Sequence, residues 1–235
     1  MFLLCHVFAG MVLGIALVRP PRLPLAVLVA VAGSLFADLL DKPLALLLAD
    51  PGSIGQTFGH TLLAWLLILA AATVIYLYSR NRLVFLFPAA VLLHQVMDMA
   101  WRDPVTWFYP LLGPLVDCQC GGEGYVGTQS LAEVVSISEW IFFAAILVAG
   151  ALVFREWITV RTGRDPAPAA RRLFPGVIVL LALMGVAAAI AGALGLPTPL
   201  LAGEIDPSGD LMLAAVSLAG AALLVIHRER VGATG

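Results

Sequence analysis

Several histidines and aspartates of this chain are spaced so that their side chains could hold a metal ion. His94 and Asp98 are four positions apart, which places both on the same face of a helix. His60 opens an apolar run, and Asp38 and Asp41 come at the end of another. Imidazole and carboxylate groups are ligands for Zn²⁺, Mn²⁺ and Fe²⁺. The pattern therefore predicts a metal site if the chain brings these elements together.

The elements that carry these residues are continuous apolar runs. Of the 235 residues 61% are hydrophobic and only 12% are charged, which leaves too little polar surface for a soluble fold. The runs are Phe2–Val18, Leu23–Leu40, His60–Tyr78, Leu83–Met99, Val134–Phe154, Leu173–Leu196 and Leu211–Ile226. About 20 apolar residues cross the hydrocarbon core as a helix. We therefore predict an all-α integral membrane protein, a bundle of about seven transmembrane helices.

The basic residues predict how this bundle is oriented. When the loops are assigned alternately to the two sides, all but two of the 13 basic residues fall on one side. The two exceptions are Lys42 and Arg102. By the positive-inside rule, the N-terminus is outside and the C-terminus is cytoplasmic. We expect a multi-pass protein of the plasma membrane, with the first run retained as a helix because no basic stretch precedes it.

Under this orientation, the ionisable residues of the predicted helices gather at one depth, near the outer face. Each has an ordinary explanation when taken alone, such as a histidine at the membrane interface or an aspartate beside Lys42. Together they are costly in a membrane unless they are paired, solvated or bound to a metal. These residues come from four helices and are His6, Asp38, Asp41, His60, His94 and Asp98. The expected site is therefore extracytoplasmic.

The chain divides into a part that carries this site and a part that does not. Residues 1–154 hold five of the predicted helices and a long outer loop, 100–132. Aromatic residues of this loop, such as Trp101 and Trp107, suit the lipid interface. Residues 155–235 add two further transmembrane helices without ionisable residues, which we interpret as scaffold.

Three segments around these residues have sequences that can be compared with those of known families. They are Gly33–Pro43 (GSLFADLLDKP), Gly55–Leu63 (GQTFGHTLL) and Leu93–Asp98 (LHQVMD). They resemble the YdjM-like family of membrane-bound metal-dependent hydrolases. The DLLDKP motif is most similar to the sequences of archaeal members. The resemblance covers roughly residues 1–115.

The resemblance implies an activity and a ligand set. The family is distantly related to zinc-dependent phospholipase C, whose members are helical enzymes that hydrolyse phosphoesters with zinc held by His and Asp. The resemblance places the ligand motifs of these enzymes at His6, Asp41, His60, His94 and Asp98. No outer histidine follows His94, so we expect one or two ions of a divalent metal, with Zn²⁺ preferred.

These residues suggest a hydrolytic mechanism. A bound metal lowers the pKa of its water and polarises a phosphoryl oxygen. Asp38 or Glu139 would accept the proton of the water, and Arg102 would pair either with a phosphate or with a neighbouring aspartate. We expect hydrolysis of a lipid or lipid-linked phosphoester at the outer membrane face, with membrane lipid as the partner. A net charge of −2 without an outward basic patch argues against nucleic acid.

Two other functions are consistent with the same residues. A divalent-cation transporter would use them as a binding station, but it needs polar residues that continue to the cytoplasmic side and broken half-helices, which the runs lack. A non-catalytic membrane scaffold would have no turnover, so activity of a metal-loaded preparation separates it from a hydrolase.

Overall fold

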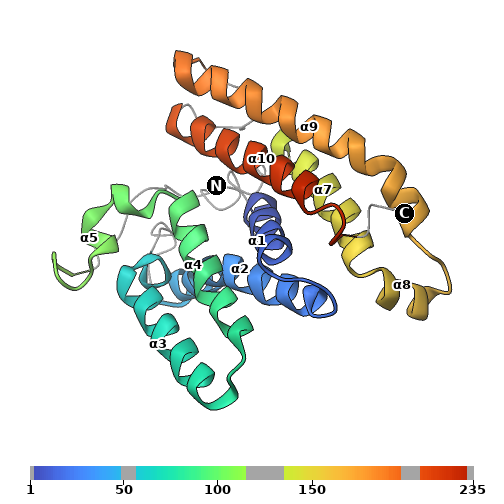
Figure 1. The fold of residues 1–235 in the computed structure, drawn as a ribbon. Helices are drawn as coiled ribbons and strands as arrows, with labels where there is room; N and C mark the ends of the chain where they lie inside the picture. The colour runs from blue at the N-terminus through green and yellow to red at the C-terminus, as the bar shows by residue number, and fades with distance from the viewer. Residues whose placement is uncertain (1–2, 49–56, 115–134, 197–206, 232–235) are drawn as a thin grey trace. The chain divides into compact units, whose positions relative to one another are not determined.

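The computed structural model describes residues 3–48, 57–114, 135–196 and 207–231. This part of the chain consists of α-helices and short 3₁₀ turns, without a strand (Figure 1). Each of the seven apolar runs overlaps one of the longer helices. These are α1 (Leu3–Leu17), α2 (Leu23–Leu48), α3 (Leu62–Ser79), α4 (Leu86–Met97), α7 (Ile137–Val153), α9 (Ala167–Leu194) and α10 (Pro207–Ile226). The predicted all-α class is confirmed.

Shorter elements connect these helices. They are η1 (Phe58–His60), η2 (Arg82–Phe85), η3 (Ala100–Arg102), α5 (Pro104–Trp107) and α8 (Arg155–Thr162). The expected outer loop therefore begins with η3 and α5, and its residues 115–132 lie outside the described ranges.

Helix length supports fewer membrane spans than the seven expected. Among the described residues, four helices are long and apolar enough to cross a membrane: Leu23–Lys42 of α2, α3, α9 and α10. Helices α7 and α8 qualify only as a pair, bent by 79°, and would make a fifth span. Helix α1 has 15 residues and α4 has 12, so both are short for a span.

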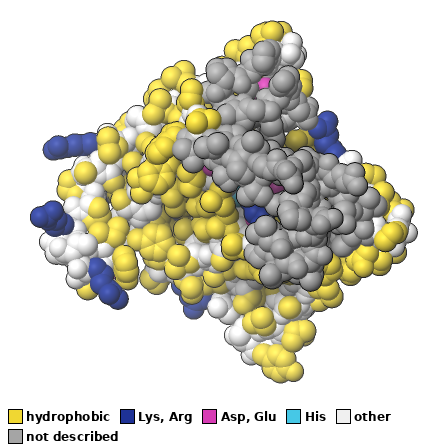
Figure 2. Space-filling view, turned by 180° about the vertical axis from the view of Figure 1, so that it is seen from behind, with side chains coloured by type: hydrophobic (Ala, Val, Ile, Leu, Met, Phe, Trp, Pro, Cys, Tyr) yellow, Lys and Arg dark blue, Asp and Glu magenta, His cyan; other side chains and the backbone are white. Residues whose placement is uncertain are grey.

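The surface of these helices suits contact with lipid. On the face shown in Figure 2, hydrophobic side chains cover much of the described surface. Leu67 of α3 is 55% exposed and Leu183 of α9 is 62% exposed. Apolar surface of this extent favours a lipid environment over water.

The chain forms two compact units. One consists of Met1–Leu28 and Ala132–Gly235, and the other of Val29–Leu131, so the boundary falls inside α2. The division at residue 154 that was expected from the sequence stays a prediction.

Close helix contacts organise the unit that spans Val29–Leu131. A Cβ atom at Gly33 of α2 would lie 2.5 Å from the carbonyl oxygen of Phe87, so α2 and α4 approach closely because this residue is glycine. The indole Nε1 of Trp65 in α3 donates a hydrogen bond to the carbonyl of Pro88 at 2.9 Å. Helix α4 is thus held against both α2 and α3.

Candidate metal centre

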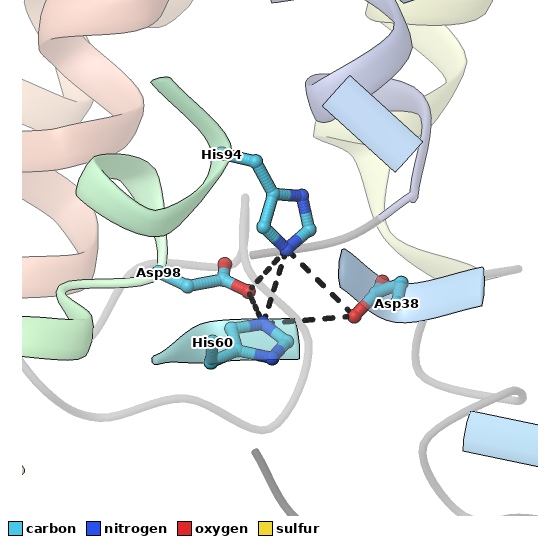
Figure 3. A group of neighbouring side chains, drawn as sticks. All are labelled: Asp38, His60, His94 and Asp98. Carbon is cyan, nitrogen blue, oxygen red and sulfur yellow. Dashed lines mark hydrogen bonds and ion pairs between the residues drawn. The ribbon is translucent and has the colours of Figure 1, made fainter. Parts of the chain in front are cut away.

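Four side chains of this unit converge on one point (Figure 3). Asp38 comes from α2, His60 ends η1, His94 lies in the last turn of α4, and Asp98 follows that helix directly. Each offers one ligand atom, and the four atoms all lie within 4.8 Å of one another. The histidines are 2% and 0% exposed, whereas Asp38 and Asp98 are 15% and 9% exposed. Solvent therefore reaches the group from the carboxylate side.

The separations of these atoms match those of ligands around a single ion. The Nε2 atoms of His60 and His94 are 3.1 Å apart. Asp98 Oδ2 lies 3.5 and 3.4 Å from these two nitrogens, and Asp38 Oδ1 lies 3.9 and 3.8 Å from them. Ligands about 2.1 Å from a tetrahedral zinc ion are separated by about 3.4 Å. The group could hold a metal ion without large rearrangement.

The contacts of the outer ring nitrogens determine where the hydrogens lie when both rings are neutral. His94 Nδ1 lies 2.7 Å from the carbonyl oxygen of Ser34, and His60 Nδ1 lies 2.7 Å from Asp41 Oδ2. These oxygens only accept, so each Nδ1 carries a hydrogen. Neutral rings would then direct two lone pairs at each other beside two carboxylate oxygens. Such an arrangement requires a cation at its centre, either a metal ion or a proton.

The protonation of His60 follows from this geometry. His60 lies ahead of α3, outside the candidate span. Burial alone would lower the pKa of His60, but hydrogen bonds to Asp41 and Asp98 outweigh this effect and raise the pKa to about 9. At neutral pH a proton on His60 thus supplies the positive charge when no metal is bound, and a metal ion must displace it.

Asp41 holds the segment that presents His60. Asp41 is only 1% exposed. Its carboxylate accepts hydrogen bonds from the backbone N–H groups of Thr57 at 2.8 Å and Gly59 at 2.6 Å. A Cβ atom at Gly59 would lie 2.8 Å from the carbonyl oxygen of Ala37 and 2.9 Å from Asp41 Oδ1. The η1 turn can therefore approach α2 this closely only with glycine before the histidine.

Gln95 fixes the same turn from the side of α4. It is fully buried, and its Nε2 donates to the carbonyls of Gly59 at 3.0 Å and Thr61 at 3.1 Å. The Thr61 hydroxyl caps α3 by accepting from the N–H of Ala64. Gln95 was not among the site residues predicted from the sequence, although a glutamine next to His94 in an apolar run was a signal for a buried polar contact.

The structure gives the two predicted aspartates of α2 different neighbours. His60, His94 and Asp98, all expected as ligands, lie together. Asp38, expected as the proton acceptor, joins them. Asp41, expected as a ligand, does not belong to the four-residue group and instead contacts the outer nitrogen of His60.

The other expected site residues are not members of the four-residue group. His6 is buried in α1 and Glu139 in α7, both in the other unit. The Glu139 carboxylate accepts from the backbone N–H groups of Leu4 at 2.7 Å and Cys5 at 3.2 Å, so it caps the first turn of α1. Arg102 is exposed in η3, in the same unit as the four-residue group. The proposed roles of His6, Glu139 and Arg102 remain predictions.

The model of a family described as YdjM inner membrane protein matches residues 1–192, which include all four residues of the group. No curated protein and no solved structure matches the chain.

Proposed function

This chain belongs to the YdjM inner membrane protein family, and we propose that it is a metal-dependent hydrolase of a lipid or lipid-linked phosphoester. The observation that carries the proposal is the convergence of two imidazole nitrogens and two carboxylate oxygens within 4.8 Å. Zn²⁺ is the proposed ion because it prefers nitrogen and oxygen ligands in a tetrahedral arrangement. The distant relation to zinc-dependent phospholipase C is part of this proposal.

We assign three of the four side chains to the ion. His60, His94 and Asp98 are the proposed ligands, since three protein ligands and one open position characterise catalytic zinc sites. Asp38 is the most exposed of the four, and its Oδ1 lies farthest from the two nitrogens. Its other oxygen accepts a hydrogen bond from Lys42 Nζ at 3.0 Å, so Asp38 already has a cationic partner besides the two histidines.

The chemistry then divides among these residues. A metal bound here would lower the pKa of a water molecule and polarise a phosphoryl oxygen. Asp38 would accept the proton of that water. Asp41 keeps His60 in the tautomer and orientation that expose its Nε2, as outer carboxylates do for metal-bound histidines. Arg102, exposed near the end of α4, is the proposed contact for a substrate phosphate.

The proposed location is the outer face of the plasma membrane, with the N-terminus outside and the C-terminus in the cytoplasm. The asymmetry of the basic residues supports this orientation. His60 lies just before α3 and Asp98 just after α4, so a site at the depth of lipid headgroups would follow. The apolar part of the substrate would then stay in the membrane.

Turnover of a panel of lipid phosphoesters by metal-loaded protein, with and without chelator, tests the proposal. His94→Ala should abolish both metal binding and turnover. Asp38→Asn should retain the metal and lose turnover, because only the proton acceptor is removed. If Asp38→Asn lost the metal, Asp38 would be a fourth ligand. If metal-replete parent protein hydrolysed none of the panel, the scaffold function would replace the hydrolase.

A further inference from the structure

A pocket of about 860 Å³ lies in the unit formed by residues 1–28 and 132–235. Its wall includes Pro20 and Pro21 in the turn after α1, Leu152 at the end of α7, and Val231 beyond α10. The pocket is therefore bounded by the ends of three helices and the start of α2. In a membrane, helix ends mark the level of the lipid headgroups.

Helix α8 forms one side of this pocket and has the features of an interfacial helix. It turns by 79° away from α7. Trp157 is 62% exposed and Val160 is 86% exposed, and the guanidinium of Arg161 lies 5.5 Å from the centre of the Trp157 ring. An amphipathic helix with exposed tryptophan and arginine is typical of segments that lie along a membrane surface. The pocket thus opens where lipid headgroups would be.

The pocket wall carries charges of both signs. Arg155 pairs with Asp165 through its Nε at 2.9 Å and its Nη2 at 2.6 Å, and Arg230 Nη1 donates to a carbonyl at the end of α1 at 3.1 Å. A guanidinium has five N–H donors, so both arginines keep donors for an anion. Glu156 and Glu229 also line the wall and form no salt bridge within the described ranges.

One buried hydroxyl of the wall indicates a missing hydrogen-bond partner. Thr159 Oγ1 is buried and has no hydrogen-bond partner among the described residues. A buried hydroxyl without a partner is unfavourable, and a phosphate oxygen is a strong acceptor for it.

We propose that this pocket binds a zwitterionic phospholipid with an ethanolamine headgroup. The phosphate contacts Arg155, Arg230 and Thr159, and the ammonium contacts Glu156 and Glu229. An anionic headgroup without an amine has no ammonium group, so Glu156 and Glu229 would have no cationic partner in the lipid. A choline headgroup offers no N–H donor, so it pairs with carboxylates less well. The apolar residues of the wall, among them Leu152 and Val160, contact the acyl chains.

Native mass spectrometry of the delipidated full-length protein tests the headgroup preference. Dioleoyl phosphatidylethanolamine, phosphatidylglycerol and phosphatidylcholine are added separately at equal concentration. The parent should bind the ethanolamine lipid roughly threefold to fivefold more than either other lipid, as expected for partly exposed ion pairs. The double variant Glu156→Gln/Glu229→Gln should lose this preference. Arg172→Gln on α9 is exposed and outside the pocket, and it should keep the preference.

Thr159→Val is a second test that does not depend on the acidic residues. It removes the hydroxyl without changing the side-chain shape, so the melting temperature of lipid-free protein should stay equal or rise. Binding of the ethanolamine lipid should fall severalfold. The proposal is overturned if phosphatidylglycerol binds as well as phosphatidylethanolamine, if the double variant retains the preference, or if Thr159→Val leaves binding unchanged.

Discussion

The substitution Asp41→Asn tests whether Asp41 acts through His60 or is itself a metal ligand. The carboxylate accepts three hydrogen bonds, from the N–H groups of Thr57 and Gly59 and from His60 Nδ1, at 2.8, 2.6 and 2.7 Å. Asparagine keeps one acceptor oxygen and adds an NH₂ group, so at least one of these donors would face another donor. Loss of such an outer partner typically weakens metal binding by about 10-fold to 100-fold, roughly 1.4–2.7 kcal/mol.

Competition with protons makes the size of this effect depend on pH. Asp41 is one of two carboxylates that raise the pKa of His60 to about 9. At pH 7 a group with this pKa is protonated in about 99% of metal-free molecules, and the metal must displace that proton. Asp41→Asn lowers the pKa of His60 and relieves the competition. The loss of affinity should therefore be largest near pH 9 and smaller at pH 7.

Titration with Co²⁺ measures both the affinity and the coordination, because tetrahedral Co²⁺ absorbs visible light strongly. The matched control is Asp103→Asn, since Asp103 only caps α5 through the N–H of Thr106. The control should bind Co²⁺ like the parent at both pH values. Unchanged affinity of Asp41→Asn near pH 9 would refute the orienting role. Complete loss of Co²⁺ binding, as expected for Asp98→Asn, would instead identify Asp41 as a ligand.

The remaining predictions concern the turn, the proton, a helix contact and the topology. Gly59→Ala should lower the melting temperature and weaken Co²⁺ binding, because the added Cβ would lie 2.8 Å from a carbonyl oxygen and overpacking costs about 1–3 kcal/mol. The affinity for Co²⁺ should rise about tenfold per pH unit below pH 9, because His60 must lose its proton; the metal-free protein should lose stability between about pH 6.5 and 9, since a raised pKa stabilises only the protonated form. Trp65→Phe should cost about 1 kcal/mol of stability through its lost 2.9 Å hydrogen bond while leaving Co²⁺ affinity unchanged. Reporter fusions should read external near Gly121 and cytoplasmic at Gly235, and the reverse result would contradict the proposed orientation.

Helical spacing was sufficient to place part of the site. The four-residue interval predicted that His94 and Asp98 share a face, and both point at one centre. Helical spacing did not predict which of the two aspartates, Asp38 or Asp41, would lie in the four-residue group. The two are three positions apart on α2 and share a face, so their roles depend on how closely the η1 turn approaches that helix. Gly59 decides this approach through a backbone contact that has no periodic signature.

The lengths of the helices differ from the apolar runs for local reasons. The run Leu83–Met99 becomes a 3₁₀ turn followed by a helix of 12 residues. Pro88 is the third residue of α4, where its missing N–H needs no partner, so the helix begins just before it. The helix ends at Met97 with Asp98 as its C-cap, and Met99, with a φ of 51°, cannot continue it. Hydropathy alone does not detect these breaks, which is why the run looked like one continuous span.

The contact between Glu139 and the first turn of α1 has a consequence for biosynthesis. The acceptor lies 135 positions after Leu4, so it is translated long after α1 has left the ribosome. At about 5–20 residues per second, synthesis of the intervening 135 residues takes roughly 7–27 s, and the first N–H groups of α1 lack this carboxylate during that time. Until α7 is made, α1 must be stabilised by other groups, such as water or lipid headgroups at the membrane surface. The native placement of the first helix is therefore completed late, by a segment from the second half of the chain.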